Sequence, residues 1–200
     1  MNLIKDSIDK KNFPITSIIN LSITSGIVPN QLKIARVIPL FKSGERDIFS
    51  NYRPVSILPA FSKILERVMY NRLLRFLNAF KILSDNQYGF RKHHSTAYAL
   101  ACLYDKISSA IENKEYTVGI YIDLSNAFDT VDHHILTSKH EHYGVRGTAL
   151  RCFESYLSGR QQYVEFNGIC SESCRINFWM PQGSILGPSC FARNYSSPPV

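Results

Sequence analysis

One carboxylate, Asp123, stands at the point where an apolar, alternating stretch of sequence ends. Val118, Ile120 and Ile122 alternate with less apolar residues, and a period of two predicts a β-strand. A carboxylate at the exit of a buried strand is held rigidly and still reaches a cleft. Hard oxygen ligands of this kind suit Mg²⁺. An Asp at a strand end can instead cap the following turn or helix, so Asp123 alone has two interpretations.

Three further blocks of sequence accompany this stretch. Upstream lie NYRPVSILPAFSKILE at residues 51–66 and NQYGFRKHHST at residues 86–96, and downstream lies MPQGSILGP at residues 180–188. Together with YIDLSNAFDTVDH at residues 121–133, and in this order, they resemble the reverse transcriptase domain of non-LTR retrotransposons of the Jockey-like, LINE-type kind. The resemblance covers the chain from about Gly26 to Pro188. Its specificity comes from the combination, because no single block is specific.

The resemblance implies a fold and a reaction. The fold is α+β, a right-hand polymerase with fingers at residues 1–115 and the N-terminal part of the palm at residues 116–200, together one partial reverse transcriptase domain. The reaction is RNA-directed DNA synthesis, a nucleotidyl transfer from deoxynucleoside triphosphates to a DNA primer on an RNA template. Enzymes of this kind use two Mg²⁺ (or Mn²⁺) ions, which clamp the attacking and leaving oxygens.

The resemblance also implies a metal site and a gate next to it. Asp123 matches the first catalytic metal carboxylate of the family, and the backbone carbonyl of Leu124 is implied as a further ligand. Phe128 matches the aromatic gate that excludes a 2′-hydroxyl and so favours deoxynucleotides. Plain core packing is the alternative role for Phe128.

Four residues match substrate-binding positions of the family. Lys42 and Arg53 match the fingers residues that hold the incoming triphosphate. An ammonium acts there as a point charge, whereas a guanidinium donates to phosphate oxygens in a bidentate way. Gln182 and Gly183 match the motif that packs against the nascent base pair, and glycine permits a close backbone approach.

Basic charge is concentrated in the first half of the chain. Residues 1–115 hold 17 Lys and Arg against 9 Asp and Glu, a net of +8, whereas residues 116–200 hold 6 against 7, a net of −1. This asymmetry fits a polyanion held by the first half and processed by the second. Basic proteins that bind no nucleic acid are also common, so charge alone leaves both interpretations open.

Four basic residues are the candidates for nucleic-acid binding. Arg67 and Arg75 share one side of a predicted helix at residues 60–80 and could contact backbone phosphates. The alternative is an ordinary solvated helix face. Arg91 and Lys92 follow aromatic residues in a loop around Gly89, and aromatics interleaved with Arg can stack on unpaired bases.

The elements that must position these residues follow from periodicity and caps. We expect helices at 2–25 (broken near Pro14), 60–80, 95–113, 133–142 and 148–158, and strands at 34–41, 117–122, 161–166 and 175–179. A polar, basic turn at residues 42–53 and a return strand make a hairpin with 34–41 that can carry Lys42 and Arg53 toward a ligand, and the apolar side of the helix at 95–113 is expected to face inward. The last two strands are joined through Asn167-Gly168, and Asp132 caps the helix that follows it. Trp179 replaces the glycine that precedes Pro-Gln-Gly in the family. We therefore expect residues 180–188 to be less ordered than the strand that leads to Asp123.

The resemblance stops after Pro188. The aromatic-Ala-Asp-Asp motif, which carries the other two metal carboxylates in the family, does not occur in these 200 residues. We therefore expect a truncated copy of a reverse transcriptase domain that does not polymerise on its own. The alternative is a catalytically inactive remnant that binds nucleic acid.

Several other classes of protein are not expected. No apolar run approaches the roughly 18 residues of a membrane span, and the N-terminal residues are too charged for a secretory signal. The five cysteines form no disulfide framework. The histidines at 133–142 include no pair at four-residue helical spacing, so we expect no zinc. We expect an intracellular protein of the nucleus or cytoplasm that contacts no membrane; the oligomeric state stays open.

Overall fold

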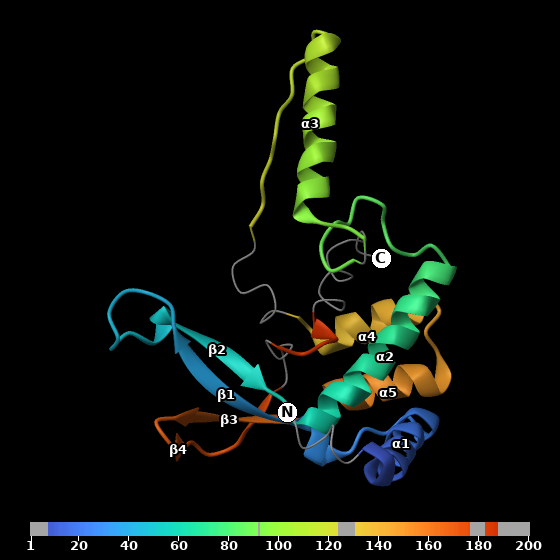
Figure 1. The fold of residues 1–200 in the computed structure, drawn as a ribbon, viewed down its shortest axis with the longest axis vertical. Coiled ribbons are helices and arrows are strands. Elements are labelled where there is room, and N and C mark those ends of the chain that lie inside the picture. The colour runs from blue at the N-terminus through green and yellow to red at the C-terminus, as the bar shows by residue number, and fades with distance from the viewer. Residues whose placement is uncertain (1–7, 92, 124–130, 177–182, 188–200) are drawn as a thin grey trace.

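The computed structural model describes residues 8–91, 93–123, 131–176 and 183–187 (Figure 1). Within these residues the helices are α1 (Ile8–Ser25), α2 (Ala60–Ala79), α3 (Thr96–Glu112), α4 (His133–His142) and α5 (Gly147–Leu157), with 3-10 turns η2 (Asn30–Lys33) and η3 (Phe49–Asn51). The strands are β1 (Ile34–Phe41), β2 (Tyr52–Ile57), β3 (Arg160–Phe166), β4 (Ile169–Cys170) and β5 (Cys174–Ile176). The mixed α+β class is as predicted. No described helix is long and apolar enough to cross a membrane.

One sheet joins the two halves of the chain. Its strand order is β2–β1–β3–β4, and β5 also pairs with β3. β1 and β2 form an antiparallel hairpin in which Leu40 lies opposite Arg53. β1 also pairs in parallel with β3, where Ala35 lies opposite Gln162. Because β1 and β3 come from different halves, residues 1–115 and 116–200 share one sheet.

A tight turn at Asn167 and Gly168 follows β3. Both residues have positive φ, 50° and 80°, as a two-residue type I′ hairpin requires. The turn leads into the short strand β4, and β5 then returns to the beginning of β3, where Arg175 lies opposite Gln161. The predicted pairing of 161–166 with 175–179 is confirmed as far as Ile176, and the structure adds β4 between them.

The core lies on the helical side of the molecule. Buried apolar side chains of α2, α4 and α5 form one cluster, which also includes Val28 and Leu186. In α2 they follow one stripe at four-residue spacing: Leu65, Met69, Leu73 and Leu77.

The helix at the N-terminal side differs from the expectation. Pro14 lies inside α1, so the predicted break near Pro14 is wrong. A proline removes one helical hydrogen bond and crowds the preceding turn. Ile19 and Ile23, on the later turns of α1, pack against the core, and their burial offsets that cost.

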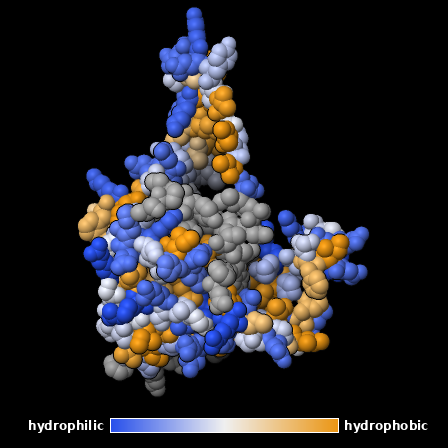
Figure 2. All heavy atoms as spheres, turned by 180° about the vertical axis from the view of Figure 1, so that it is seen from behind, coloured by the Kyte–Doolittle hydropathy of each residue, from blue (hydrophilic) through white to orange (hydrophobic). Residues whose placement is uncertain are grey.

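Two segments whose apolar residues recur in a pattern that predicts burial are exposed. Residues 115–123 run without strand pairing, and Val118, Ile120 and Ile122 are 84%, 82% and 81% exposed. α3 contains no buried residue, and it projects from the rest of the molecule with apolar side chains along it (Figures 1 and 2). The predicted strand at 117–122 and the inward face of α3 are therefore wrong for the described chain. Apolar periodicity shows that a face suits burial, but burial needs a neighbour, and no described residue supplies one.

Amide hydrogen exchange should show this difference directly. We expect amides of residues 118–122 in the 200-residue chain to exchange near their unprotected rates, because no described hydrogen bond holds them. Amides of β1 that pair with β2 or β3 should exchange at least about 100-fold more slowly, since they open only with the sheet. Exchange measured by NMR would contradict the structure if residues 118–122 were protected as strongly as β1.

Candidate nucleotide and nucleic-acid site

Lys42 and Arg53 lie on the same face at the end of the β1–β2 hairpin. Arg53 lies opposite Leu40, and the Lys42 N–H extends the ladder by donating to the Asn51 carbonyl at 2.8 Å. Residues two apart in a strand share a face, so Lys42 stands diagonally across from Arg53. Both side chains are exposed, and neither forms an ion pair with a described residue. The hairpin therefore presents two neighbouring cations to solvent.

Aromatic rings close the opposite face of the same hairpin. The Tyr52 ring lies edge-on to Phe41 at 5.5 Å and to Phe166 at 6.5 Å between centroids. The Arg46 guanidinium lies 5.4 Å from the Phe41 ring centroid, and the Tyr52 hydroxyl donates to the Arg46 carbonyl at 2.9 Å. The loop between the strands is thus tied to this face, which leaves the face of Lys42 and Arg53 open.

The segment at residues 183–187 lies against β2 and α2. Gly183 has φ of +114°, and a Cβ built on it would lie 2.8 Å from the Ser56 carbonyl oxygen. Only glycine fits both the conformation and the contact. Leu186 is fully buried in the core cluster, and the Gly187 N–H donates to Ser184 Oγ at 2.9 Å. The other half of the predicted pair, Gln182, lies outside the described residues.

A buried carboxylate holds this segment to the helices. Glu66 of α2 is fully buried. One of its oxygens accepts from the Tyr156 hydroxyl of α5 at 2.5 Å, and the other accepts from the Ile185 N–H at 2.7 Å. Burial raises the pKa of the Glu66 carboxyl, and the two hydrogen bonds and the positive charges of Arg160 and Lys63 oppose that shift.

The described part of this segment, residues 183–187, is better anchored than the prediction for residues 180–188 expected. Residues 183–187 make two backbone hydrogen bonds to side chains and bury Leu186, whereas residues 118–122 have no strand partner. Within the described chain, the segment after Pro-Gln is therefore the better anchored of the two. Trp179, on which the prediction rested, lies outside the described residues.

The basic side of α2 is exposed as predicted. Arg67 and Arg75 point to solvent, as does Lys63 one turn before Arg67. The Arg67 guanidinium lies 5.9 Å from the Tyr70 ring centroid. These cations remain accessible to a polyanion, and an ordinary solvated face has the same appearance, so their role stays a prediction.

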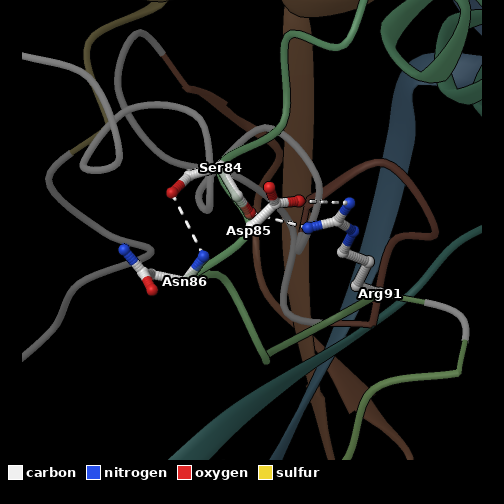
Figure 3. Close-up of polar contacts among 4 residues, drawn as sticks. All are labelled: Ser84, Asp85, Asn86 and Arg91. Carbon is white, nitrogen blue, oxygen red and sulfur yellow. Dashed lines mark hydrogen bonds and ion pairs between the residues drawn. The ribbon is translucent and has the colours of Figure 1, made fainter.

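Arg91 is engaged within its own loop (Figure 3). Its guanidinium donates to the Ser84 carbonyl at 2.6 Å and lies 3.6 Å from the Asp85 carboxylate. The Arg91 side chain is only 20% exposed, whereas that of Asp85 is fully exposed. Arg91 therefore closes the loop around Gly89, and its nucleic-acid role stays a prediction. Lys92 lies outside the described residues.

Asp123 stands alone in the described chain. It is exposed and follows the unpaired segment, not a buried strand. The helix cap in this region is Asp132, whose Oδ1 accepts from the N–H groups of His134 and Ile135 at 2.7 and 3.1 Å; the Ile135 bond is the main cause that lowers the pKa of Asp132. Leu124 and Phe128 lie outside the described residues.

The described residues offer one carboxylate, Asp123, at the predicted metal position. Mg²⁺ in proteins is often held by one or two carboxylates, with waters and substrate phosphates completing the shell. Asp123 offers one such oxygen ligand, but the described residues contain no group of three His, Cys, Asp or Glu that could hold an ion. The chemistry of Asp123 fits the expected ion, and a site would need further ligands.

Residues 42–197 match the reverse transcriptase (RNA-dependent DNA polymerase) family. The chain belongs to this family. It is 35% identical over 176 residues to the RNA-directed DNA polymerase from mobile element jockey of Drosophila melanogaster, an alignment that covers 88% of this chain and 19% of that protein. It is 33% identical over 195 residues to the probable RNA-directed DNA polymerase from transposon BS of the same organism, covering 91% and 21%.

A third relative is similar to this chain over nearly the same length. The probable RNA-directed DNA polymerase from transposon X-element of Drosophila melanogaster is 34% identical over 176 residues, covering 87% of this chain and 19% of that protein. The chain thus spans about a fifth of the length of these relatives. The predicted resemblance to non-LTR retrotransposon reverse transcriptases is confirmed, and the roles of individual residues remain predictions.

The sequence prediction missed the buried residues that hold the segment at residues 183–187 in place. Glu66, Tyr156 and Arg160 are fully or almost fully buried, yet none was a candidate. One signal was present: Glu66 directly follows Leu65 and lies three residues before Met69, both on the apolar stripe of α2. A carboxylate beside a buried stripe indicates a buried polar partner, but the partner cannot be named from sequence.

Replacing Gly183 by alanine should destabilise the chain. The new Cβ would meet the Ser56 carbonyl oxygen at 2.8 Å in a backbone conformation that L-residues avoid, at a cost of about 1–3 kcal/mol. Gly89→Ala is the matched control, because a Cβ built on Gly89 meets nothing within 4 Å and the φ of Gly89 is not positive. Urea unfolding of both variants measures the difference, and equal stabilities would contradict the Gly183 contact.

Proposed function

We propose that this chain forms the fingers, at residues 1–115, and the first part of the palm, at residues 116–200, of an RNA-directed DNA polymerase. The polymerase would extend a DNA primer on an RNA template from deoxynucleoside triphosphates, in the nucleus or cytoplasm. The observation that carries the proposal is the exposed pair Lys42 and Arg53 on one face of the hairpin, within the region that matches the reverse transcriptase family.

In this proposal Lys42 and Arg53 hold the triphosphate of the incoming nucleotide. Arg53 donates through its planar guanidinium to two phosphate oxygens, and Lys42 adds a compact point charge next to it. The antiparallel ladder fixes their separation, and the aromatic contacts of Tyr52 hold the hairpin from the other side. The two cations are thereby arranged before the nucleotide arrives, which reduces the entropy lost on binding.

Asp123 would hold Mg²⁺ or Mn²⁺ through a carboxylate oxygen, and the carbonyl of Leu124 would offer a further oxygen ligand. Two such ions, when bound, would activate the primer 3′-hydroxyl and stabilise the leaving pyrophosphate. Phe128 would exclude a 2′-hydroxyl, and Gln182 with Gly183 would pack against the nascent base pair. Arg67, Arg75, Arg91 and Lys92 would contact the template and primer.

The second candidate function is nucleic-acid binding without catalysis. It is favoured by the charge of residues 33–92, which hold 12 Lys and Arg against 4 Asp and Glu, and by the single Asp at the expected metal position in these 200 residues. Nucleotide binding separates the two candidates, because a binding module needs no triphosphate site.

Removing either hairpin cation should weaken nucleotide binding. We expect Lys42→Ala and Arg53→Ala each to raise the dissociation constant of a deoxynucleoside triphosphate by about 10-fold, the value of a hydrogen bond to a charged group. Arg53→Lys should also weaken binding, because an ammonium cannot replace the bidentate contact. Photo-crosslinking of an azido-deoxynucleotide to the chain with its primer–template measures the constants.

Arg46→Ala is the matched control in this experiment. Arg46 belongs to the same hairpin, but its guanidinium lies over Phe41 on the opposite face. An equal loss in Arg46→Ala, or no loss in Arg53→Ala, would contradict the assignment. A wild-type chain that binds primer–template but no nucleotide would favour the second candidate function.

The basic side of α2 should contribute to the salt dependence of nucleic-acid binding. The Arg67→Ala, Arg75→Ala double variant should lower the slope of log K against log salt by roughly 1.4–1.8, if each residue contacts one phosphate. The Arg151→Ala, Arg175→Ala double variant is the control, because both residues are exposed and belong to α5 and β5, in the half of the chain without a net positive charge. Filter binding at several salt concentrations gives the slopes, and equal slopes in the two variants would contradict the contact.

A further inference from the structure

The segment that follows the Pro-Gln-Gly motif is held by side-chain contacts and not by strand pairing. Its Ile185 N–H donates to Glu66 at 2.7 Å, Gly183 lies against the Ser56 carbonyl oxygen, and Leu186 is fully buried. Glu66 is the one charged group among these contacts. Its removal would leave the Ile185 N–H without its described partner.

Both oxygens of Glu66 are committed. The Tyr156 hydroxyl donates to Oε1 at 2.5 Å and the Ile185 N–H donates to Oε2 at 2.7 Å, so the carboxylate cannot rotate without breaking one bond. Tyr156 is in turn fixed by the fully buried Arg160, whose guanidinium stacks on its ring at 4.7 Å and donates to its carbonyl at 3.1 Å. The orientation of Glu66 is therefore set by α5 and β3, on the far side of the core.

We propose that Glu66 is a positioning residue, which holds the backbone at Ile185 so that Gly183 stays against β2 and presents a fixed surface to the base pair. The inference rests on the proposed function, since that function places Gln182 and Gly183 against the nascent pair. Glu66 acts through the Ile185 amide and touches no substrate.

A carboxylate at this position is costly for a purely structural role. Burying a charge is expensive, and well-packed apolar residues of similar volume often stabilise a core better than a buried ionic group does. What the carboxylate adds is two acceptors aimed in fixed directions at two different segments. This geometry is what a rigid binding surface needs from its supporting residues.

Three variants separate positioning from general stability. Glu66→Met keeps the volume but removes both acceptors. Glu66→Gln keeps one oxygen for Ile185, while its amide can donate to the Tyr156 hydroxyl, which is able to accept. Tyr156→Phe removes only the other bond of Glu66, so it perturbs the same buried network and leaves the Ile185 bond in place.

The experiment is residue-resolved amide exchange by NMR on the 200-residue chain, with circular dichroism as the check of folding. We expect the Ile185 amide to exchange roughly 10- to 100-fold faster in Glu66→Met, the equivalent of one hydrogen bond to a charged group. It should stay protected in Glu66→Gln and in Tyr156→Phe. If Glu66→Met does not fold, Glu66→Asp, which withdraws the carboxylate by one methylene, should give the faster exchange.

The functional readout is nucleotide affinity on a primer–template. Glu66→Met should bind the next deoxynucleoside triphosphate about 10-fold more weakly, as expected for a displaced contact surface, with primer–template affinity unchanged, and Glu66→Gln should restore the affinity. An Ile185 amide that stays protected in Glu66→Met and in Glu66→Asp, or that is released equally by Tyr156→Phe, overturns the proposal. A wild-type chain that binds no nucleotide overturns the proposed function instead, and the exchange result still decides whether Glu66 holds Ile185.

Discussion

The carboxylate of Glu66 joins parts of the chain that are far apart in sequence. It lies in α2, accepts from Tyr156 in α5, and accepts from Ile185 in the segment after the Pro-Gln-Gly motif. Leaving a buried polar group without its hydrogen-bond partner costs about 1–3 kcal/mol, a substantial share of the roughly 5–15 kcal/mol that stabilises a typical domain. The packing of α2 on α5 and the place of residues 183–187 therefore depend on one another, because both use the same side chain.

Two cations, Lys33 and Arg160, are also buried where the sheet meets the helices. Lys33 and Arg160 are 5% and 0% exposed, and burial, followed by the charge of Arg160, lowers the pKa of Lys33. Lys33 Nζ donates to Ser155 Oγ at 3.4 Å, a weak compensation for a desolvated ammonium. A junction of sheet and helices that only needed stability would be apolar. Its polar groups instead fix where β3, α5 and η2 meet, and this precision is what a supporting framework contributes to a binding site.

Local features of the fold could be predicted from sequence, and long-range ones could not. The hairpin of β1 and β2, the cap at Asp132 and the turn at Asn167-Gly168 depend on residues close together in the chain, and the structure contains all three. The predicted strand at 117–122 is absent from the described chain. Its alternating pattern suits a strand, but pairing depends on a neighbour that is distant in sequence. Glu66 was missed for the same reason, since its partners lie 90 and 119 residues away. Likewise, the exposure of Lys42 and Arg53 followed from motif and pattern, whereas the contact of Arg91 with the Ser84 carbonyl depends on how an irregular loop folds back on itself.

β2 connects the two parts of the proposed nucleotide site, the hairpin cations and Gly183. Arg53, near its beginning, faces the open side of the hairpin, and the Ser56 carbonyl, near its end, contacts Gly183. Three residues of extended chain separate them by about 10 Å, the scale on which a nucleoside triphosphate reaches from its terminal phosphate to its base. A single strand thus sets the distance between the cations proposed for the phosphates and the glycine proposed for the base pair. Because Glu66 holds Ile185 two residues after Gly183, a shift of α2 against β2 would change that distance, and so the core of the protein and the proposed nucleotide site cannot vary independently.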